Sequence, residues 1–366
     1  MKKITAMAMA VMLMASATAS AQTIAPKGKV VKPSDSHILY VGRIDNSNAD
    51  RPVFTFPGVQ IRSGFTGTSL KMMAKPKSGY FMAQIDGGEA FKVGFNSEQD
   101  SIVSLATALK KGKHQVNVMY VNEGYDRMPE FWGFIVDEGC SLTDAKALPE
   151  KRIEFIGNSI TCGYGVEASS ESCHFMDETS NHYYTYAAET ARRLGAMHYT
   201  VARSGIGVYR NYNGPKTGDA VNMNTEYSHT LLYKKDAAWD FSRYTPQLVC
   251  INLGTNDTST TGADPKLLQK GYENLYKQVR SHYPEAKIVF LCGCMMRGEN
   301  DVAVAKKAMD ETMEKAHNEG DKEVYRFDFT PHDGSLGYGA DWHPSYKQHQ
   351  KMADELTPYV KKLMGW

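Results

Sequence analysis

The sequence has almost no net charge and, beyond its first residues, no long hydrophobic run. It contains 42 basic and 41 acidic side chains in 366 residues, which excludes the strongly basic surface typical of proteins that bind nucleic acids or anionic membranes. After residue 21, no stretch approaches the ~18 consecutive apolar residues of a membrane-spanning helix. These absences favour a soluble protein that acts on an uncharged substrate, with no nucleic acid partner and no membrane span.

Cysteine is also scarce, and its spacing excludes two kinds of site. Six cysteines in a chain of this length do not make a disulfide scaffold. Cys292-Gly293-Cys294 has neither the spacing nor the nearby histidine of a zinc site. Cys250 lies in an apolar run, where a cysteine is usually a small buried hydrophobe. Cys162 and Cys173 lie in a segment rich in glycine and serine, and we predict a disulfide between them.

Residues 1–21 have the pattern of a secretory signal peptide. Lys2 and Lys3 precede an apolar segment, and Ala19-Ser20-Ala21 matches a small-residue cleavage site. Removing the two lysines changes the charge balance to 40 basic and 41 acidic residues, against 42 and 41 in the whole chain. The pattern predicts an exported protein, secreted or periplasmic. The remaining chain of about 345 residues exceeds what one core usually organises, so we expect two domains.

The first domain is predicted to be all β. Residues 22–36 are polar and contain two prolines, so a flexible lead is expected there. Over 37–145, β-forming segments recur at roughly 8–12-residue intervals, and turn residues such as Asp86-Gly87-Gly88 separate them. This pattern, with no helical segment, predicts a jelly-roll sandwich. Strands are expected at 37–44, 53–56, 69–74, 80–85, 90–94, 102–106, 115–121 and 131–136.

The second domain is predicted to be α/β. Residues 142–149 form the expected linker, and strand and helix segments alternate over 150–366. Asp264 and Pro265 have the N-cap and first-turn preferences of a helix start. Such alternation predicts three layers, with a parallel sheet covered on both faces. Strands are expected at 152–156, 197–202, 247–253, 287–292 and 324–329, and helices at 181–194, 264–283, 302–318 and from 344 onward with a kink at Pro358.

Polar residues follow three of these strands and precede the last helix. Gly157-Asn158-Ser159 ends the first strand, Arg203 to Gly207 follows the second, and Gly254-Thr255-Asn256-Asp257 follows the third. Asp341-Trp342-His343-Pro344 comes just before the last helix. Because the carboxyl ends of parallel strands meet at one edge, where ligands of open α/β sheets bind, we expect these side chains to converge.

The residue types are those that ester hydrolysis requires. Ser159 supplies a nucleophilic hydroxyl and His343 a base. In extended chain, residues i and i+2 lie on the same side, so Asp341 would orient the imidazole. Backbone N–H groups of Ser159 and Gly205, with the side-chain amide of Asn256, would form an oxyanion hole. Gly205 suits this role because the absence of a Cβ allows a close approach.

Simpler interpretations remain open for several of these residues. Asn256 can be a turn residue and Asp341 an N-cap, and Asp257 is interpreted as bracing its loop. Three aromatic residues are candidates either for substrate binding at a sugar site or for core packing: Trp342, Tyr209 and Tyr212. Four other histidines compete with His343 as the base: His174, His182, His332 and His349.

Taken together, the four segments resemble the motif blocks of the SGNH (GDSL-like) hydrolase superfamily over residues 150–366. Two blocks depart from the usual pattern: Gly157-Asn158-Ser159 stands in place of Gly-Asp-Ser, and Asp341-Trp342-His343 in place of Asp-x-x-His. With the leading sandwich and the run from Gly157 to Gly165, the chain resembles carbohydrate esterase family two over nearly its whole length.

This resemblance implies a serine esterase that removes O-acetyl groups from neutral plant polysaccharides or oligosaccharides such as xylan, mannan or glucomannan. Several members of the family prefer acetyl groups on the 6-hydroxyl of hexoses, and some use a Ser–His dyad. The resemblance implies no metal or cofactor, and the sequence predicts no oligomeric state. A lipolytic or thioesterase SGNH enzyme is an alternative, which the polar segment 207–233 disfavours. Another is a carbohydrate-binding protein with a vestigial hydrolase domain, which the presence of Ser159, Gly205, Asn256 and His343 disfavours.

Overall fold

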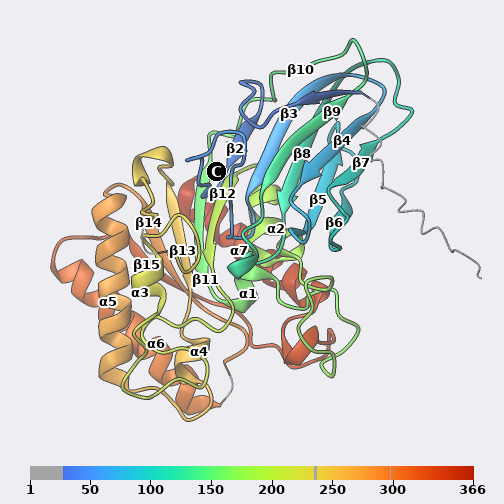
Figure 1. Ribbon diagram of the computed structural model, residues 1–366. Coiled ribbons are helices and arrows are strands. Elements are labelled where there is room, and N and C mark those ends of the chain that lie inside the picture. The colour runs from blue at the N-terminus through green and yellow to red at the C-terminus, as the bar shows by residue number, and fades with distance from the viewer. Residues whose placement is uncertain (1–27, 235–236, 297) are drawn as a thin grey trace, which may run out of the picture.

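The structure, a computed structural model, describes residues 28–234, 237–296 and 298–366. The predicted signal peptide and residues 22–27 of the predicted lead lie outside these ranges. Two parts are seen in Figure 1: an all-β part coloured blue to green at the upper right, and an α/β part below it. In the part of the chain that is described, no helix has the length and apolar character needed to cross a membrane.

The N-terminal part is a sandwich of two antiparallel sheets, in agreement with the predicted fold class. One sheet has the order β1-β9-β4-β7 and the other the order β10-β3-β8-β5-β6, with β2 paired to β3. Apolar side chains from the facing surfaces fill the core between them. The strands are β1 (Lys29–Val31), β2 (Leu39–Val41), β3 (Gln60–Gly67), β4 (Leu70–Ala74), β5 (Gly79–Ile85), β6 (Phe91–Phe95), β7 (Ile102–Ala106), β8 (Gly112–Tyr120), β9 (Phe131–Val136) and β10 (Leu142–Thr143).

The sequence predictions for the sandwich need four corrections. β3, a central strand, was not predicted because it contains two glycines, which have low β-propensity. β1 pairs with β9, so the predicted flexible lead is ordered from residue 29 onward. The predicted strand at 53–56 forms only isolated bridges at Val53. β10 pairs with β3, so strand structure continues into the predicted linker.

The C-terminal part is a five-stranded parallel sheet with the order β12-β11-β13-β14-β15. β11 lies between β12 and β13, so the residues that follow these three strands are neighbours at one edge. The strands are β11 (Arg152–Gly157), β12 (Met197–Ala202), β13 (Leu248–Asn252), β14 (Lys287–Cys292) and β15 (Val324–Asp328). The longer helices are α2 (Tyr186–Leu194), α5 (Pro265–His282), α6 (Glu299–Asn318) and α7 (Tyr346–Met364).

Helices cover both faces of this sheet, which gives the predicted three layers. α5 and α6 pack on one face against residues such as Ile156 and Ile251. α2 and α7 pack on the other face against residues such as Phe155 and Cys250. Successive residues of a strand point to opposite faces, so a sheet covered on both sides needs strands that are apolar along their whole length.

The helices lie where the sequence predicted them, but some of their boundaries differ. The helix predicted at 181–194 is divided into a 3-10 turn, η2 (His182–Tyr184), and α2, with the Thr185 side chain accepting from the N–H of Ala188 at 3.3 Å. α7 includes Pro358 and continues to Met364. Three short helices were not predicted: α1 (Ser159–Cys162), α3 (Met223–Glu226) and α4 (Thr255–Thr258).

Candidate active site

Ser159 lies where β11 turns into α1. The turn requires glycine at position 157, because a Cβ there would lie 2.0 Å from Oγ1 of Thr161. Asn158 caps the short helix, its side-chain oxygen accepting from the N–H of Ile160 at 3.0 Å. The Ser159 hydroxyl therefore lies at the carboxyl edge of the sheet.

His343 contacts the Ser159 hydroxyl directly, with 2.8 Å between Nε2 and Oγ. Its other ring nitrogen, Nδ1, lies 3.0 Å from the carbonyl oxygen of Ala340. A carbonyl can only accept, so Nδ1 carries the proton and Nε2 is free to accept one from Ser159. The ring of Tyr164 stacks on the imidazole, with 4.1 Å between centroids. Burial lowers the pKa of His343 to about 4, so the imidazole is neutral at neutral pH.

The carboxylate of Asp341 does not contact His343 in the way the sequence predicted. It accepts from the hydroxyl of Tyr164 at 2.6 Å and from Nδ1 of His174 at 2.9 Å. The expectation assumed extended chain, but Asp341 and Trp342 have φ values of 48° and 66°. This left-handed turn directs the carboxylate away from the imidazole. Asp341 therefore acts on His343 through Tyr164, the residue that stacks on the ring, and through its charge near the imidazole.

Three predicted oxyanion donors surround the same space. Ser159, Gly205 and Asn256 follow adjacent strands, and all three line one cavity. Gly205 has a φ of 76°, and a Cβ built there would meet no atom within 4 Å. A glycine is favoured at this position because of the left-handed backbone, not because space is short. The side-chain nitrogen of Asn256 donates to the carbonyl of Ile206 at 2.8 Å, which leaves its second N–H for another acceptor.

The three predicted aromatic residues lie in different surroundings, and one of them lines the cavity. Tyr212 is 55% exposed and lines the cavity. Trp342 is also exposed and packs edge-on against Tyr338, with 5.1 Å between ring centroids. Tyr209 is buried in the core, where its hydroxyl accepts from the N–H of Asp264 at 2.8 Å. The sugar-site prediction for Tyr209 is therefore wrong, because its ring is enclosed by apolar side chains.

Asp257 has the bracing role that the sequence suggested. Its carboxylate accepts from the backbone N–H groups of Val208, Tyr209 and Arg210 at 2.9–3.1 Å. Burial raises its pKa to about 6 despite these bonds. The segment after β12 is thus held to the segment after β13 by one carboxylate.

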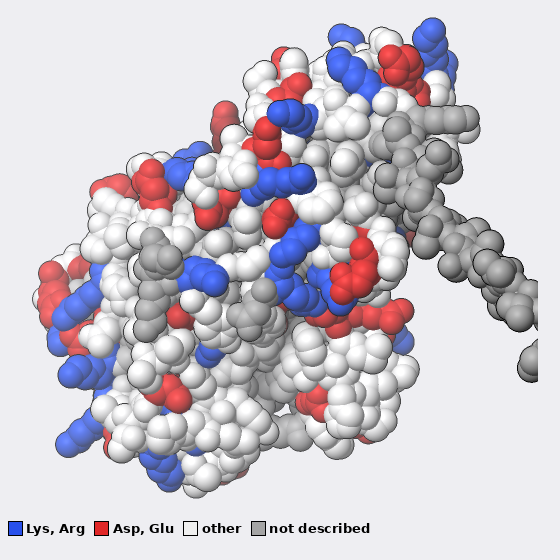
Figure 2. All heavy atoms as spheres, viewed as in Figure 1, with Lys and Arg blue, Asp and Glu red and all other residues white. Residues whose placement is uncertain are grey.

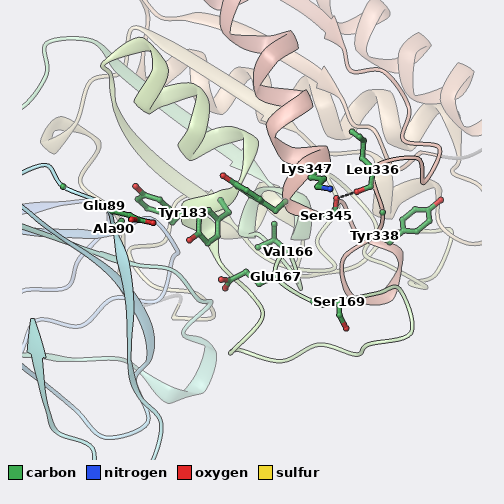
Figure 3. Close-up of a pocket in the computed structure, with 15 residues that line it drawn as sticks. Glu89, Ala90, Val166, Glu167, Ser169, Tyr183, Leu336, Tyr338, Ser345 and Lys347 are labelled. Atoms are coloured by element: carbon green, nitrogen blue, oxygen red, sulfur yellow. Dashed lines mark hydrogen bonds between the residues drawn. The ribbon is translucent and has the colours of Figure 1, made fainter.

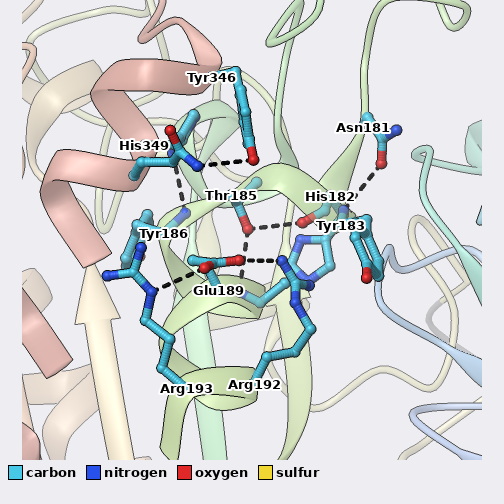
Figure 4. A network of polar contacts seen from close by, with 12 residues as sticks. Asn181, His182, Tyr183, Thr185, Tyr186, Glu189, Arg192, Arg193, Tyr346 and His349 are labelled. Atoms are coloured by element: carbon cyan, nitrogen blue, oxygen red, sulfur yellow. Dashed lines mark hydrogen bonds and ion pairs between the residues drawn. The ribbon is translucent and has the colours of Figure 1, made fainter. Parts of the chain in front are cut away.

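The competing histidines have other partners. Figure 4 shows His182 and His349 within a polar network around α2 and the start of α7. Nδ1 of His349 accepts from the N–H of Tyr186 at 3.1 Å, and Nδ1 of His182 lies 2.8 Å from the carbonyl of Thr161. His174 pairs with Asp341 at the surface, and His332 packs edge-on against Tyr338.

The predicted disulfide between Cys162 and Cys173 is absent, since both residues are free thiols. Cys162 lies in α1 with its side chain buried against Glu123 and Ser204. Cys173 lies near the surface, where its sulfur contacts the hydroxyls of Ser169 and Ser170 at 3.5 and 3.7 Å. The helical turn directs the first thiol inward, whereas the second stays within its own loop.

Two residues at the site were not predicted from the sequence. Tyr164 stacks on His343, and its position between two glycines just after Ser159 is a local signal that an aromatic residue faces the site. Glu123 binds Ser204 from the sandwich domain. No local pattern identifies Glu123, because its partner lies 81 residues away in the chain.

The Ser159–His343 pair opens into a cavity of about 370 Å³. Its lining includes Ser159, His343, Gly205, Asn256, Tyr212 and Met295. A larger depression of about 730 Å³ lies between the sandwich and the α/β domain (Figure 3), with Tyr183, Tyr338 and Glu167 among its lining residues. The residues that line this depression include no histidine to serve as a base, so the smaller cavity is the candidate active site.

Charge is dispersed over the molecular face in Figure 2, where acidic and basic side chains are interspersed without a broad patch of either sign. This distribution agrees with the near balance of 42 basic and 41 acidic residues. The face in view therefore offers no continuous electrostatic attraction for a polyanion.

Comparison with sequence families assigns both parts of the chain. Residues 40–145 match the family described as carbohydrate esterase 2 N-terminal. Residues 155–351 match the GDSL-like lipase/acylhydrolase family. This match, together with a serine at a strand end that contacts a histidine in a three-layer α/β/α domain, defines the chain as a GDSL-like hydrolase. More particularly, with its matching N-terminal sandwich, it belongs to the family two carbohydrate esterases.

Similar proteins cover most of the chain. Cellulase/esterase CelE of Acetivibrio thermocellus is 38% identical over 330 residues, which are 90% of this chain but only 40% of CelE. The chain thus spans about two-fifths of that relative. An acetylxylan esterase / glucomannan deacetylase of Cellvibrio japonicus is 27% identical over 96% of both chains. A family two carbohydrate esterase from Clostridium thermocellum, solved with cellohexaose, has a TM-score of 0.82 and 38% identity over 90% of this chain and 99% of its own.

Proposed function

We propose that the protein is a serine esterase that removes O-acetyl groups from neutral plant polysaccharides or oligosaccharides. The observation that carries the proposal is the 2.8 Å contact between Oγ of Ser159 and Nε2 of His343 at the edge of a 370 Å³ cavity. In this proposal Ser159 and His343 form a catalytic dyad, and Asp341 is a positioning residue.

The first half of the reaction forms an acetyl-enzyme. Nε2 of His343 takes the proton from Ser159 as Oγ attacks the acetyl carbonyl. The resulting oxyanion accepts from the N–H groups of Ser159 and Gly205 and from the amide of Asn256. The bond to the sugar oxygen then breaks, and that oxygen takes the proton from His343, which releases the sugar with a free hydroxyl.

The second half returns the enzyme to its starting state. His343 takes a proton from a water molecule as its oxygen attacks the acetyl carbon, and the same donors hold the second oxyanion. The bond from the carbon to Oγ breaks, Ser159 takes the proton from His343, and acetate leaves. While the imidazole is charged, the carbonyl of Ala340 accepts its Nδ1 proton and the nearby Asp341 carboxylate attracts it.

The substrate class is supported by the relatives and by the lining of the cavity. The Cellvibrio japonicus relatives, described as acetylxylan esterase / glucomannan deacetylase, cover more than nine-tenths of this chain, so acetylated xylan, mannan or glucomannan are the substrates to test. The cavity has polar residues Ser204, Asn256 and Ser259 beside the dyad. Side chains of this kind can hydrogen-bond the hydroxyl groups of a sugar.

The proposal is tested by comparing p-nitrophenyl acetate with the octanoate ester. Each methylene that the acyl pocket cannot bury is expected to change kcat/KM by about 10–200-fold, so acetate should be strongly preferred. Similar kcat/KM values for the two esters would make the protein a lipolytic enzyme. NMR of acetylated xylan, mannan and glucomannan during the reaction would identify the polymer and the hydroxyl that is freed.

Ser159→Ala is the control for these assays. It removes the nucleophile, so activity should fall by about three orders of magnitude or more while the protein stays folded. A folded Ser159→Ala protein that keeps more than about a tenth of the wild-type kcat would disprove the assignment of the nucleophile.

We also propose that the protein is exported, on the evidence of the charged, apolar and Ala-Ser-Ala segments in residues 1–21. N-terminal sequencing of protein recovered from the periplasm or culture medium of a bacterial host should begin at Gln22. Retention of full-length chain in the cytoplasm would contradict this proposal.

A further inference from the structure

The loop between β8 and β9 leaves the sandwich and packs against the loops of the α/β domain. It contains the 3-10 turn η1 (Tyr125–Arg127). Asn122 donates to the carbonyls of Asp177 and Ser180 at 2.9 and 2.8 Å. Arg127 forms an ion pair with the carboxylate of Asp177, with one contact of 2.9 Å from Nη2 to Oδ1. These contacts hold the loop, which we name the wedge loop (residues 121–130), on the α/β domain.

Glu123 of the wedge loop is buried and binds the segment that follows β12. It is 4% exposed. Its carboxylate accepts from the backbone N–H of Ser204 at 2.6 Å and from the Ser204 hydroxyl at 2.5 Å. The hydroxyl of Tyr125 donates to it at 2.5 Å. A buried carboxylate is tolerated only when donors satisfy its oxygens, and two of these three donors belong to Ser204.

Ser204 immediately precedes Gly205, the residue whose N–H is proposed to bind the oxyanion. Both residues line the cavity. Gly205 has no side chain to fix it, and a Cβ at its position would touch nothing. Ser204 binds the Glu123 carboxylate through both its backbone N–H and its hydroxyl. The Gly205 carbonyl accepts from the N–H of Tyr212 at 2.9 Å, so a backbone contact and a carboxylate from the other domain together hold the Ser204–Gly205 turn.

We infer that Glu123 is a positioning residue through which the sandwich domain fixes the Ser204–Gly205 turn for catalysis. This inference rests on the proposed esterase function. An oxyanion donor contributes only if it is held at the place where negative charge develops. A turn that can rotate would lose part of that contribution while leaving substrate binding in the ground state nearly unchanged.

Glu123→Gln tests the inference, because the amide keeps the size of the side chain but replaces one accepting oxygen with a donor. We expect kcat for p-nitrophenyl acetate to fall by about 10–100-fold, with KM changed by less than about threefold. Ser204→Ala removes the hydroxyl contact but keeps the N–H contact, so its loss of kcat should be smaller.

The double variant separates a direct partnership from general damage. If Glu123 acts through Ser204, Glu123→Gln should cost less in the Ser204→Ala background than in the wild-type protein. Additive losses would overturn the inference, since they would mean that the two residues act independently.

Thr55→Val is the matched control. Thr55 is also buried in the sandwich and accepts, through Oγ1, from the N–H of Leu232 in the α/β domain at 2.7 Å. It makes an interdomain hydrogen bond without touching the cavity, so the variant should lower thermal stability and leave kcat near the wild-type value. A Glu123→Gln protein with the same stability loss and a similarly unchanged kcat would show a merely structural role and overturn the inference.

Ser159→Ala, assayed in parallel, separates this inference from the proposed function. If Ser159→Ala is inactive and Glu123→Gln is fully active, the positioning role fails while the esterase stands. If Ser159→Ala keeps its activity, the proposed function fails, and the positioning inference fails with it.

Discussion

The imidazole of His343 is held on three sides by uncharged groups. Nε2 faces the Ser159 hydroxyl, Nδ1 donates to the carbonyl of Ala340, and the ring of Tyr164 covers one face. A backbone carbonyl selects the same tautomer that a carboxylate would select, because it also accepts the Nδ1 proton. The carboxylate of Asp341 then contributes through the Tyr164 hydroxyl and through its charge near the imidazole.

His343→Ala and Asp341→Ala should therefore differ widely in activity. Loss of the base should reduce kcat by about 10³-fold or more, as for the nucleophile. Loss of Asp341 should cost about tenfold or less, since the Ala340 carbonyl still holds the tautomer. Steady-state kinetics of both folded variants on p-nitrophenyl acetate measure the difference. Tyr164→Phe keeps the stacked ring and removes the hydroxyl bond to Asp341, so it should resemble Asp341→Ala. An Asp341 variant as inactive as His343→Ala would contradict the dyad.

The low pKa of His343 predicts the acid limb of the pH profile. Burial disfavours the charged imidazolium and lowers its pKa to about 4. The base is neutral above that pH and protonated below it, so kcat/KM should stay level from neutral pH to about 5 and fall with a midpoint near 4. A pH-rate profile, with circular dichroism at each pH to verify folding, measures this limb. A midpoint near 6.5 would indicate an imidazole in contact with water.

At the scale of elements, the site depends on contacts between loops that come from distant parts of the chain. The loop after α1 and the loop before α7 meet at Gly165 and Ala340, where the N–H of Ala340 donates to the Gly165 carbonyl at 3.1 Å. Ala340 also supplies the carbonyl that orients His343. A displacement of one loop is thus transmitted to the imidazole through Ala340.

Gly165→Ala should move His343, and Gly195→Ala provides the matched control. Both glycines have left-handed backbones, with φ values of 54° and 60°, so both substitutions carry a similar backbone cost. Only at Gly165 would the new Cβ lie 2.3 Å from Cβ of Ala340; at Gly195 it meets nothing within 4 Å. We expect Gly165→Ala to lose tenfold or more in kcat, because displacements near 1 Å can cost about 10²-fold. Equal kcat values for the two variants would refute this link.

The strand-end residues could be predicted from the sequence, whereas the turns that join them could not. Ser159, Gly205 and Asn256 follow apolar strands of a parallel sheet, and that pattern alone requires them to meet at one edge. The sequence could not reveal the left-handed turn at Asp341 and Trp342, since a bulky residue such as tryptophan rarely adopts a positive φ. Long-range pairings, such as that of Glu123 with Ser204, leave no periodic signal in the sequence. β3 was missed for a related reason, because its pairing with β8 compensates for its weak local propensity.

In the molecule as a whole, a buried ion pair joins the two domains. Arg43 of the sandwich and Glu154 of β11 are both fully buried, with 3.4 Å between Nη2 and Oε1. Arg43 also donates to the carbonyl of His229 at 2.8 Å, and its guanidinium lies near four aromatic rings, Phe56, Tyr227, Trp239 and Phe241. Burial raises the pKa of Glu154, which shows how far its carboxylate is removed from water. The domains are thus coupled at the central sheet as well as at the wedge loop.

Arg43→Ala should destabilise the protein by about 3–5 kcal/mol, because it leaves the Glu154 carboxylate buried without its partner. Urea or thermal unfolding followed by circular dichroism measures the loss. The double variant Arg43→Ala with Glu154→Gln should be less destabilised than the single variant, since the uncompensated charge is gone. Lys32→Ala, which breaks an exposed ion pair with Asp50, should have little effect on stability. If Arg43→Ala cost no more than this surface control, the buried pair would not couple the domains.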